Sequence, residues 1–276
     1  MLGALIIVFR EAIEAGLIIG IVAAVTRGVA GSRAHIAGGV AAGVFGALIV
    51  AAFAEQLSKA FAGAGQELFN AAVLMIAVVM LAWHNIWMAR HGRELAQELS
   101  DVGRAVARGD RTLFALATVV GLAVLREGSE VALFLYGVLA SGESAGSVLV
   151  GGIAGLALGA ATSLATFYGL VSIPPKRLFA VTTWLITFLA AGLAAQAVAF
   201  LQQAGTITAL SDTLWDTSWI LSDKSIPGRV LHTLIGYADQ PSQMQVVAYI
   251  ATIAAIVAAT KLTSMTAPAP AQAPAE

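Results

Sequence analysis

The sequence contains no cysteine, which excludes disulfide bonds, thiolate metal sites and thiol redox chemistry. Charge is also scarce: 11% of the 276 residues are Asp, Glu, Lys or Arg, whereas 59% are hydrophobic. With a mean hydropathy of +0.86, the chain is far too apolar for a soluble domain of this size. The composition therefore indicates a membrane protein.

Seven apolar stretches are long enough to cross a hydrocarbon core of about 30 Å, which takes about 20 helical residues. We expect an all-α, polytopic membrane protein with seven transmembrane helices and no separate soluble domain. The first stretch lacks a basic segment before it and is interrupted by charges, so we expect a retained helix and not a cleaved signal peptide. The stretches cover approximately residues 1–26, 35–54, 67–88, 112–140, 147–170, 178–203 and 245–262.

The distribution of Lys and Arg predicts an outside N-terminus, because short cytoplasmic loops collect basic residues. In this orientation ten basic residues lie inside and three outside, whereas five acidic residues lie inside and seven outside. A net negative outer surface raises the local concentration of cations. Solvated loops with capping Asp residues would give the same charges.

The charges near the middle of the apolar stretches belong to two copies of one pattern, Arg-Glu-x-x-Glu. The copies are Arg10, Glu11 and Glu14, and Arg126, Glu127 and Glu130. A charged side chain at the bilayer centre costs roughly 2.5 to 3.5 kcal/mol, so six of them indicate a function. Residues three and four positions apart share a helix face. Both Glu of a copy can therefore point inward, and its Arg can pair with the second Glu.

If the two motif helices cross, four carboxylates meet two guanidinium groups and leave a formal charge of minus 2, which a metal ion can neutralise. Carboxylates without thiolate or clustered imidazole suit hard ions such as ferric iron, Mn, Mg or Ca. We predict that Glu11, Glu14, Glu127 and Glu130 bind the metal, while Arg10 and Arg126 hold the empty site together.

Two other interpretations of the motifs stay open. Each motif could be an internal Arg-Glu salt bridge that joins two helices, although this leaves the second Glu of each copy unpaired in lipid. Protonated Glu residues in a proton relay are the other possibility.

With an outside N-terminus, the two motif helices run in opposite directions, so helices 1–3 and 4–6 would be inverted repeats, followed by a seventh helix. Gly38-Gly39-Val40-Ala41 matches Gly151-Gly152-Ile153-Ala154 at a constant offset. Inverted repeats with polar groups near the midplane are typical of transporters. The expected organisation is a first repeat over 1–90, a cytoplasmic linker over 91–111, a second repeat over 112–203, an outer loop over 204–244, the seventh helix over 245–262 and a disordered cytoplasmic tail over 263–276.

Two RExxE motifs in a seven-helix chain resemble the oxidase-dependent iron transporter family, which includes bacterial EfeU proteins and fungal high-affinity iron permeases. The usual form in that family is REGLE, whereas this chain has REAIE and REGSE, with Ala12 replacing Gly and Ser129 replacing Leu. The stretch from Leu231 to Tyr249, LHTLIGYADQPSQMQVVAY, also resembles the segment that leads into the last helix of bacterial members.

The resemblance implies a transporter, not an enzyme, that imports Fe(III), or Fe(II) coupled to oxidation, across the plasma (inner) membrane along the motif glutamates. It also implies an outer or periplasmic partner that oxidises or delivers iron: a ferroxidase in fungi, and cupredoxin-like and haem peroxidase proteins in bacteria. We expect the lipid membrane and the transported iron ion as further partners, with no permanently bound cofactor and no nucleic acid. Some family members are linked to other metals, including lead.

Two other classes of function share some of these features. A proton-coupled carrier of another metal or small solute is the main alternative, since Glu and Arg pairs are common in such carriers. A membrane di-iron oxidase would also gather carboxylates, but it should show Glu-x-x-His motifs. Neither copy of the motif has His in that position.

His84, between Trp83 and Trp87, is an accessory candidate in the third apolar stretch. It could be an exit ligand, although its Trp neighbours also suit an interfacial belt. On the same helix, Met75, Met80 and Met88 are interpreted as packing residues.

The outer loop carries Asp212 and Asp216 together with Trp215 and Trp219. These residues could form an outer docking or metal-capture patch, or an interfacial helix anchored by the two Trp side chains. Between the repeats, apolar residues at helical spacing predict an amphipathic helix on the inner membrane surface over residues 93–108.

Overall fold

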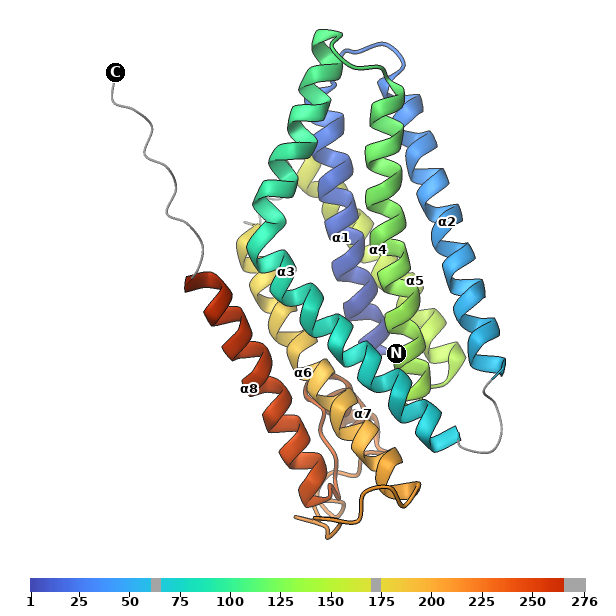
Figure 1. Ribbon diagram of the computed structural model, residues 1–276, viewed down its shortest axis with the longest axis vertical. Coiled ribbons are helices and arrows are strands. Elements are labelled where there is room, and N and C mark those ends of the chain that lie inside the picture. Colours follow the sequence, from blue (N-terminus) through green and yellow to red (C-terminus); the bar gives the residue numbers. More distant parts are fainter. Residues whose placement is uncertain (61–65, 170–174, 266–276) are drawn as a thin grey trace.

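The computed structural model describes residues 1–60, 66–169 and 175–265, and this part of the chain is almost entirely helical (Figure 1). The one isolated β-bridge within the described residues joins Thr213 to Ser242. The predicted tail lies largely outside these residues, since α8 ends at Met265. The helices are α1 (Leu2–Val25), α2 (Ser32–Ala60), α3 (Gln66–Arg108), α4 (Phe114–Ala140), α5 (Ala145–Phe167), α6 (Pro175–Gln203), α7 (Ile226–Ile235) and α8 (Gln243–Met265).

Five of these helices, α2, α3, α5, α6 and α8, contain a segment long and apolar enough to cross a membrane. Helices α1 and α4 have 24 and 27 residues, and each carries the three charged residues of one motif near its middle. The prediction of an all-helical polytopic membrane protein is therefore confirmed.

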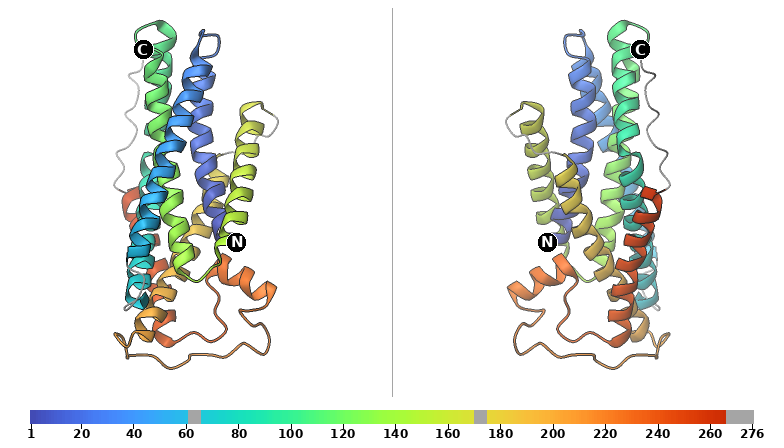
Figure 2. Two further views of the ribbon diagram at one scale, coloured as in Figure 1. Left: turned by 90° about the vertical axis from the view of Figure 1, so that its right-hand side faces the viewer. Right: turned by 90° about the vertical axis from the view of Figure 1, so that its left-hand side faces the viewer.

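Successive long helices alternate in direction along the bundle, so that α1 and α4 are antiparallel (Figures 1 and 2). The closest pairs are not sequence neighbours: α1 packs along α5, α2 along α4, and α3 along α6. The motif helices α1 and α4 also contact each other and α3. This arrangement places both motifs beside the third helix.

Glycines allow the two tight pairings, α2 with α4 and α5 with α1, and they do so in the same way. A Cβ on Gly43 would lie 2.6 Å from the carbonyl oxygen of Gly121, and a Cβ on Gly155 would lie 2.5 Å from that of Leu5. Gly121 and Leu5 each stand five residues before the Arg of a motif. The two contacts are therefore equivalent, and both depend on the absence of a side chain.

These contacts correct the register of the sequence match between α2 and α5. Gly39 faces the carbonyl oxygen of Ala117, and Gly151 faces that of Met1, again at equivalent distances along the chain from the two motifs. The structure thus pairs Gly151 with Gly39, one residue after the Gly38 that the sequence match selects. Glycine-rich helices match at more than one offset, and only the helix contacts distinguish between them.

The apolar side chains form two clusters, one on each side of the motifs along the bundle axis. The first cluster, at the N-terminal end of α1, includes Ile7, Phe134 and Leu193. The second, at the C-terminal end of α1, includes Val22 and Leu116. The charged residues therefore occupy a polar layer between two apolar clusters.

The structure differs from the predicted separate helix over 93–108, because this segment continues α3 without interruption to Arg108. Its apolar face is covered by other helices and is not available to contact a membrane surface. Leu99 and Val106 are buried in the second cluster against residues of α1 and α4, including Val22 and Leu116. The prediction of a helix from the spacing of the apolar residues is confirmed, but the apolar side of this helix faces neighbouring helices.

The interfacial Trp-anchored helix proposed for the outer loop is also wrong. Trp215 and Trp219 lie in irregular chain, and the helix in this region is α7, ten residues long. Ser225 caps its N-terminus by accepting a hydrogen bond from the Gly228 N–H (3.1 Å), and Gly236, with φ of 69°, ends it in the left-handed conformation. The residues that indicate this helix in the sequence are its caps, Ser225 and Gly236, and not the two Trp residues.

Candidate metal site

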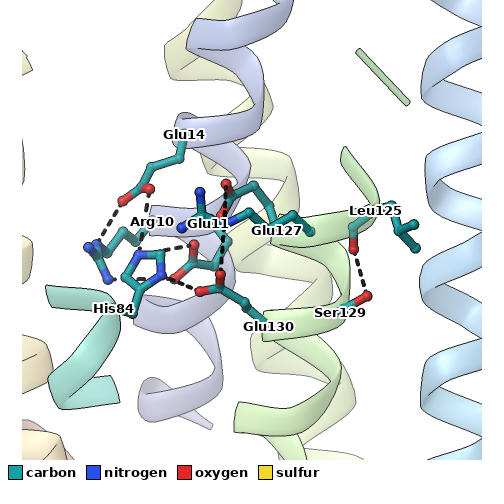
Figure 3. Close-up of polar contacts among 9 residues, drawn as sticks. Arg10, Glu11, Glu14, His84, Leu125, Glu127, Ser129 and Glu130 are labelled. Carbon is teal, nitrogen blue, oxygen red and sulfur yellow. Dashed lines mark hydrogen bonds and ion pairs between the residues drawn. The ribbon is translucent and has the colours of Figure 1, made fainter. Parts of the chain in front are cut away.

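Three helices bring the charged residues of both motifs together with His84 (Figure 3). The motif side chains extend from the middle of α1 and α4, and His84 extends from α3 toward them. Arg10, Glu11, Glu14, His84 and Glu127 are all buried. The polar layer is therefore a site shared by the two motifs.

The two motifs form the same internal ion pair. In α1, the Nε of Arg10 lies 3.0 Å from the Oε1 of Glu14. In α4, the Nε of Arg126 donates a hydrogen bond of 3.1 Å to the Oε1 of Glu130. Both pairs span one helical turn, where side chains four positions apart meet. Each Arg thus neutralises the second Glu of its own motif, as the spacing predicts.

The first Glu of each motif is held less closely. Arg10 Nη1 lies 3.6 Å from Glu11 Oε1, and Arg126 Nε lies 4.0 Å from Glu127 Oε1. All four carboxylate oxygens of Glu11 and Glu127 are buried without a hydrogen-bond partner in the described structure. Buried carboxylates need a compensating cation or hydrogen bonds, and these two are available to an ion.

His84 connects the two halves of the site. Its Nδ1 contacts Oε2 of Glu130, and its Nε2 lies 3.6 Å from Glu14 Oε2 and 3.8 Å from Glu11 Oε2. The imidazole also meets the edge of the Phe134 ring, with 6.4 Å between the ring centroids. His84 therefore lies in the centre of the polar layer, and not in an interfacial aromatic belt.

Four residues offer ligand atoms that lie within 4.8 Å of one another: Glu11, His84, Glu127 and Glu130. This set differs from the predicted four glutamates, because Glu14 lies outside it and His84 takes its place. Each second Glu is paired with its own Arg and has its other oxygen near His84. The Glu130 oxygen contacts Nδ1 of His84, whereas the Glu14 oxygen lies 3.6 Å from Nε2. Three carboxylates and one imidazole are a plausible donor set for a divalent transition metal.

The differences between the two motif copies have a structural explanation. A Cβ on Gly128 would lie 2.6 Å from the Cβ of Ala47, and a Cβ on Gly159 would lie 2.6 Å from the Cβ of Ala12. Each interface thus holds one methyl group, on α1 where it meets α5 and on α2 where it meets α4. Ser129, which replaces Leu, donates its hydroxyl hydrogen to the Leu125 carbonyl (2.6 Å) of its own helix.

Comparison with known proteins identifies the family. The iron permease FTR1 family matches residues 1–267. The chain belongs to this family. Its members are permeases, so this permease is a transporter and not an enzyme.

Curated relatives agree with this assignment over most of the chain. The permease is 32% identical over 262 residues to the protein named ferrous iron permease EfeU of Escherichia coli O6:H1, covering 92% of this chain and 93% of the relative. It is 30% identical over 249 residues to the protein of the same name from Yersinia pestis, covering 88% and 87%. No solved structure matches the chain.

Asn85 is a buried polar residue that the sequence argument did not select. It follows His84 on α3, is 2% exposed, and has no hydrogen-bond partner for either side-chain atom within the described structure. A buried amide without partners is costly. The sequence could have indicated Asn85, because a polar amide stands there among the apolar residues of a candidate membrane span.

The outer aspartates Asp212 and Asp216 do not join the polar layer. Asp216 accepts hydrogen bonds from the backbone N–H and the hydroxyl of Ser218 (2.9 and 2.6 Å) and from the Gln240 side chain (2.9 Å). The Ser218 hydrogen bonds hold the pKa of Asp216 below its usual value. Asp216 thus organises the outer loop, while Asp212 is exposed on it.

Proposed function

We propose that this chain imports iron across the plasma (inner) membrane through the polar layer formed by its two RExxE motifs. The observation that carries the proposal is the group of Glu11, His84, Glu127 and Glu130, whose ligand atoms lie within 4.8 Å of one another. They come from the middle of three helices of a membrane protein in the iron permease family. Ionisable residues at such depth line ion pathways in membrane proteins.

Charge balance favours Fe(II) as the ion that occupies the site. Four ionised carboxylates, two guanidinium groups and a neutral imidazole carry a formal charge of minus 2. A divalent ion brings this buried layer to zero, whereas Fe(III) leaves one uncompensated positive charge, which is costly inside a membrane protein. The name of the curated relatives, ferrous iron permease, agrees. Fe(III), expected from the hardness of carboxylates, is the alternative form.

The proposed topology has seven crossing helices, α1 to α6 and α8, with the N-terminus outside. Helices α1 to α3 and α4 to α6 form inverted repeats. The antiparallel α1 and α4 support this topology (Figure 1), as do the equivalent contacts at Gly43 and Gly155. The site then lies where the repeats meet, as in other transporters built in this way.

An outer protein that oxidises or delivers iron completes the proposed system. It would approach the side that holds α7 and the outer loop, where Trp219 and Ile220 are exposed. The alternative function, a proton-coupled carrier of another metal or small solute, uses the same Glu and Arg residues. A direct measurement of iron flux decides between the two functions.

The experiment is uptake of radioactive iron into liposomes that contain the purified protein, supplied as Fe(II) with ascorbate or as chelated Fe(III). Glu11→Gln and Glu127→Gln remove one ligand charge each without changing side-chain size. We expect each to lower Fe(II) uptake by more than about tenfold, equivalent to about 1.4 kcal/mol. Glu98→Gln is the matched control, because Glu98 is exposed on α3 and lies outside the site.

Equal uptake by wild type, Glu11→Gln and Glu127→Gln at matched protein levels would contradict the metal site. Proton movement with a solute but without iron flux would establish the carrier instead. Faster uptake of Fe(III) than of Fe(II) would overturn the charge-balance argument while leaving the site intact.

A further inference from the structure

The two motifs make the same ion pair but differ in access. The side chains of Arg10 and Glu14 are 2% and 1% exposed, whereas those of Arg126 and Glu130 are 34% and 17% exposed. The pair distances are nearly equal, 3.0 and 3.1 Å. The Arg-Glu ion pair is thus intact in both motifs. The greater exposure of the second motif must come from its surroundings.

A cavity of about 390 Å³ between α3 and α4 exposes the second motif. Val79, Met80, Trp83 and His84 line it from α3, and Arg126 and Glu130 line it from α4. A first hydration shell of six waters takes up about 180 Å³, at about 30 Å³ each. The cavity is therefore large enough for a hydrated metal ion next to the ligands.

A second and larger cavity of about 630 Å³ lies between the same two helices, toward the end where α3 begins and α4 ends. Gln66, Asn70 and Tyr136 supply polar groups to its lining. Met80 lines both cavities. Met80 thus separates a space near the end of the bundle from a space at the polar layer.

The alternative route along the bundle axis is closed. Between the outer ends of α1, α4 and α6 the cavity lined by Gly3 and Gln196 measures only about 30 Å³. Below it, Ile7 and Phe134 are almost completely buried in the first apolar cluster. An ion would have to displace this packed core, whereas the space between α3 and α4 already exists.

We propose that iron reaches the site from the outer side through the two cavities between α3 and α4, and that Met80 is the side chain that opens and closes their junction. This inference rests on the proposed function. Methionine suits such a role, because its unbranched side chain has three rotatable bonds and can change conformation at low cost. In the structure Met80 packs against the first apolar cluster, and in the proposal this conformation closes the junction between the two cavities.

The absence of native cysteine allows a direct test, because an introduced thiol is the only one in the protein. Val79→Cys places it in the cavity beside the site, and Leu48→Cys is the control on α2. Both native side chains are 62% exposed. A charged, membrane-impermeant thiosulfonate is added to the outside of cells that express each variant. We expect it to label Val79→Cys, more slowly when Fe(II) is present, and not to label Leu48→Cys.

Labelling of Val79→Cys as weak as that of Leu48→Cys, while Ser218→Cys in the outer loop reacts, would show that lipid fills the cavity and would overturn the proposal. Rapid labelling that Fe(II) does not slow would also overturn it, because the water-filled space would lie off the ion's route. These readouts are separate from iron flux. Failure of wild-type uptake would count against the proposed function, whatever the labelling shows.

A second pair of variants tests the junction. Met80→Trp fills it and should lower iron uptake by more than about tenfold, equivalent to about 1.4 kcal/mol in the barrier. Met75→Trp adds the same bulk on α3 at a position that lines neither cavity, and it should retain uptake. Equal uptake by Met80→Trp and Met75→Trp would exclude a route past Met80.

Discussion

The guanidinium of Arg126 lies over the indole of Trp87, with its central carbon 4.2 Å from the ring centroid. The same guanidinium donates a hydrogen bond to Glu130 and has Glu127 within 4.0 Å. Trp87 therefore holds the charge of the second motif at the edge of the site. In this position Arg126 stabilises the carboxylates of Glu127 and Glu130 without occupying the space between the grouped ligands.

Trp87→Leu should weaken iron binding, because it frees Arg126 to turn toward Glu127 and compete with the ion. A cation-π contact contributes about 0.5 to 2 kcal/mol, so the iron concentration for half-maximal uptake should rise by about 2- to 30-fold. Trp184→Leu is the control, since Trp184 packs near Phe188 on α6. An equal rise in the half-maximal iron concentration in both variants would contradict a specific role for Trp87.

His84→Ala should lower the affinity of the purified protein for Fe(II), because His84 is one of the four grouped ligands. Loss of a residue that only orients a metal ligand costs about 10- to 100-fold in affinity, so loss of a ligand should cost at least as much. Anaerobic titration calorimetry measures this change. His35→Ala is the control, since His35 is exposed on α2 and its Nδ1 pairs with the Gly31 carbonyl. Unchanged affinity in His84→Ala would exclude His84 as a ligand.

Arg10→Ala should destabilise the fold more than Arg126→Ala, although each removes the same pair. Glu14 would remain as a buried, uncompensated charge, at a cost of about 3 to 5 kcal/mol, whereas Glu130 lies beside a cavity. Thermal unfolding in detergent measures the difference. Adding Glu14→Gln to Arg10→Ala should restore part of the lost stability. Without that recovery, the Arg10 effect must come from something other than its ion pair.

Gly43→Val and Gly155→Val should lower the unfolding temperature by similar amounts, because each places a side chain against an equivalent carbonyl. Overpacking of this kind costs about 1 to 3 kcal/mol. Gly38→Ala should be tolerated, since a Cβ at that helical position meets no atom within 4 Å. A large effect at only one of the two valine positions would argue against equivalent repeats.

The outer loop should keep its arrangement in acid until the pH falls below the usual range of an Asp side chain. Hydrogen bonds from Ser218 lower the pKa of Asp216, so their contribution is present above the ordinary Asp pKa and is lost as pH falls through the lower folded value. Fluorescence of the neighbouring Trp residues as a function of pH measures this transition. In Asp216→Asn the acid transition should disappear, and an unchanged transition would assign it to another group.

The approximate positions and the apolar character of the long helices could be read from the sequence, because both depend on local composition. The extension of α3 beyond residue 93 and the helix at Ile226–Ile235 could not. An amphipathic stretch such as the one around Leu99 and Val106 has the same pattern whether its apolar side meets lipid or another helix. Helix α1, which covers this stretch together with α4, is distant from it in sequence.

The sequence by itself determined that two sets of Arg and Glu lie near the middle of two long helices and that each Arg pairs within its own motif. These properties follow from helical spacing and from the cost of charge in lipid. Only the tertiary structure decided that His84 joins the carboxylates, that Glu14 lies outside the group, and that one motif adjoins a cavity. Which side chains meet across helices depends on how each helix is rotated and where it crosses its neighbours. Here the glycine contacts allow α1 to approach α5, and α2 to approach α4, at close range.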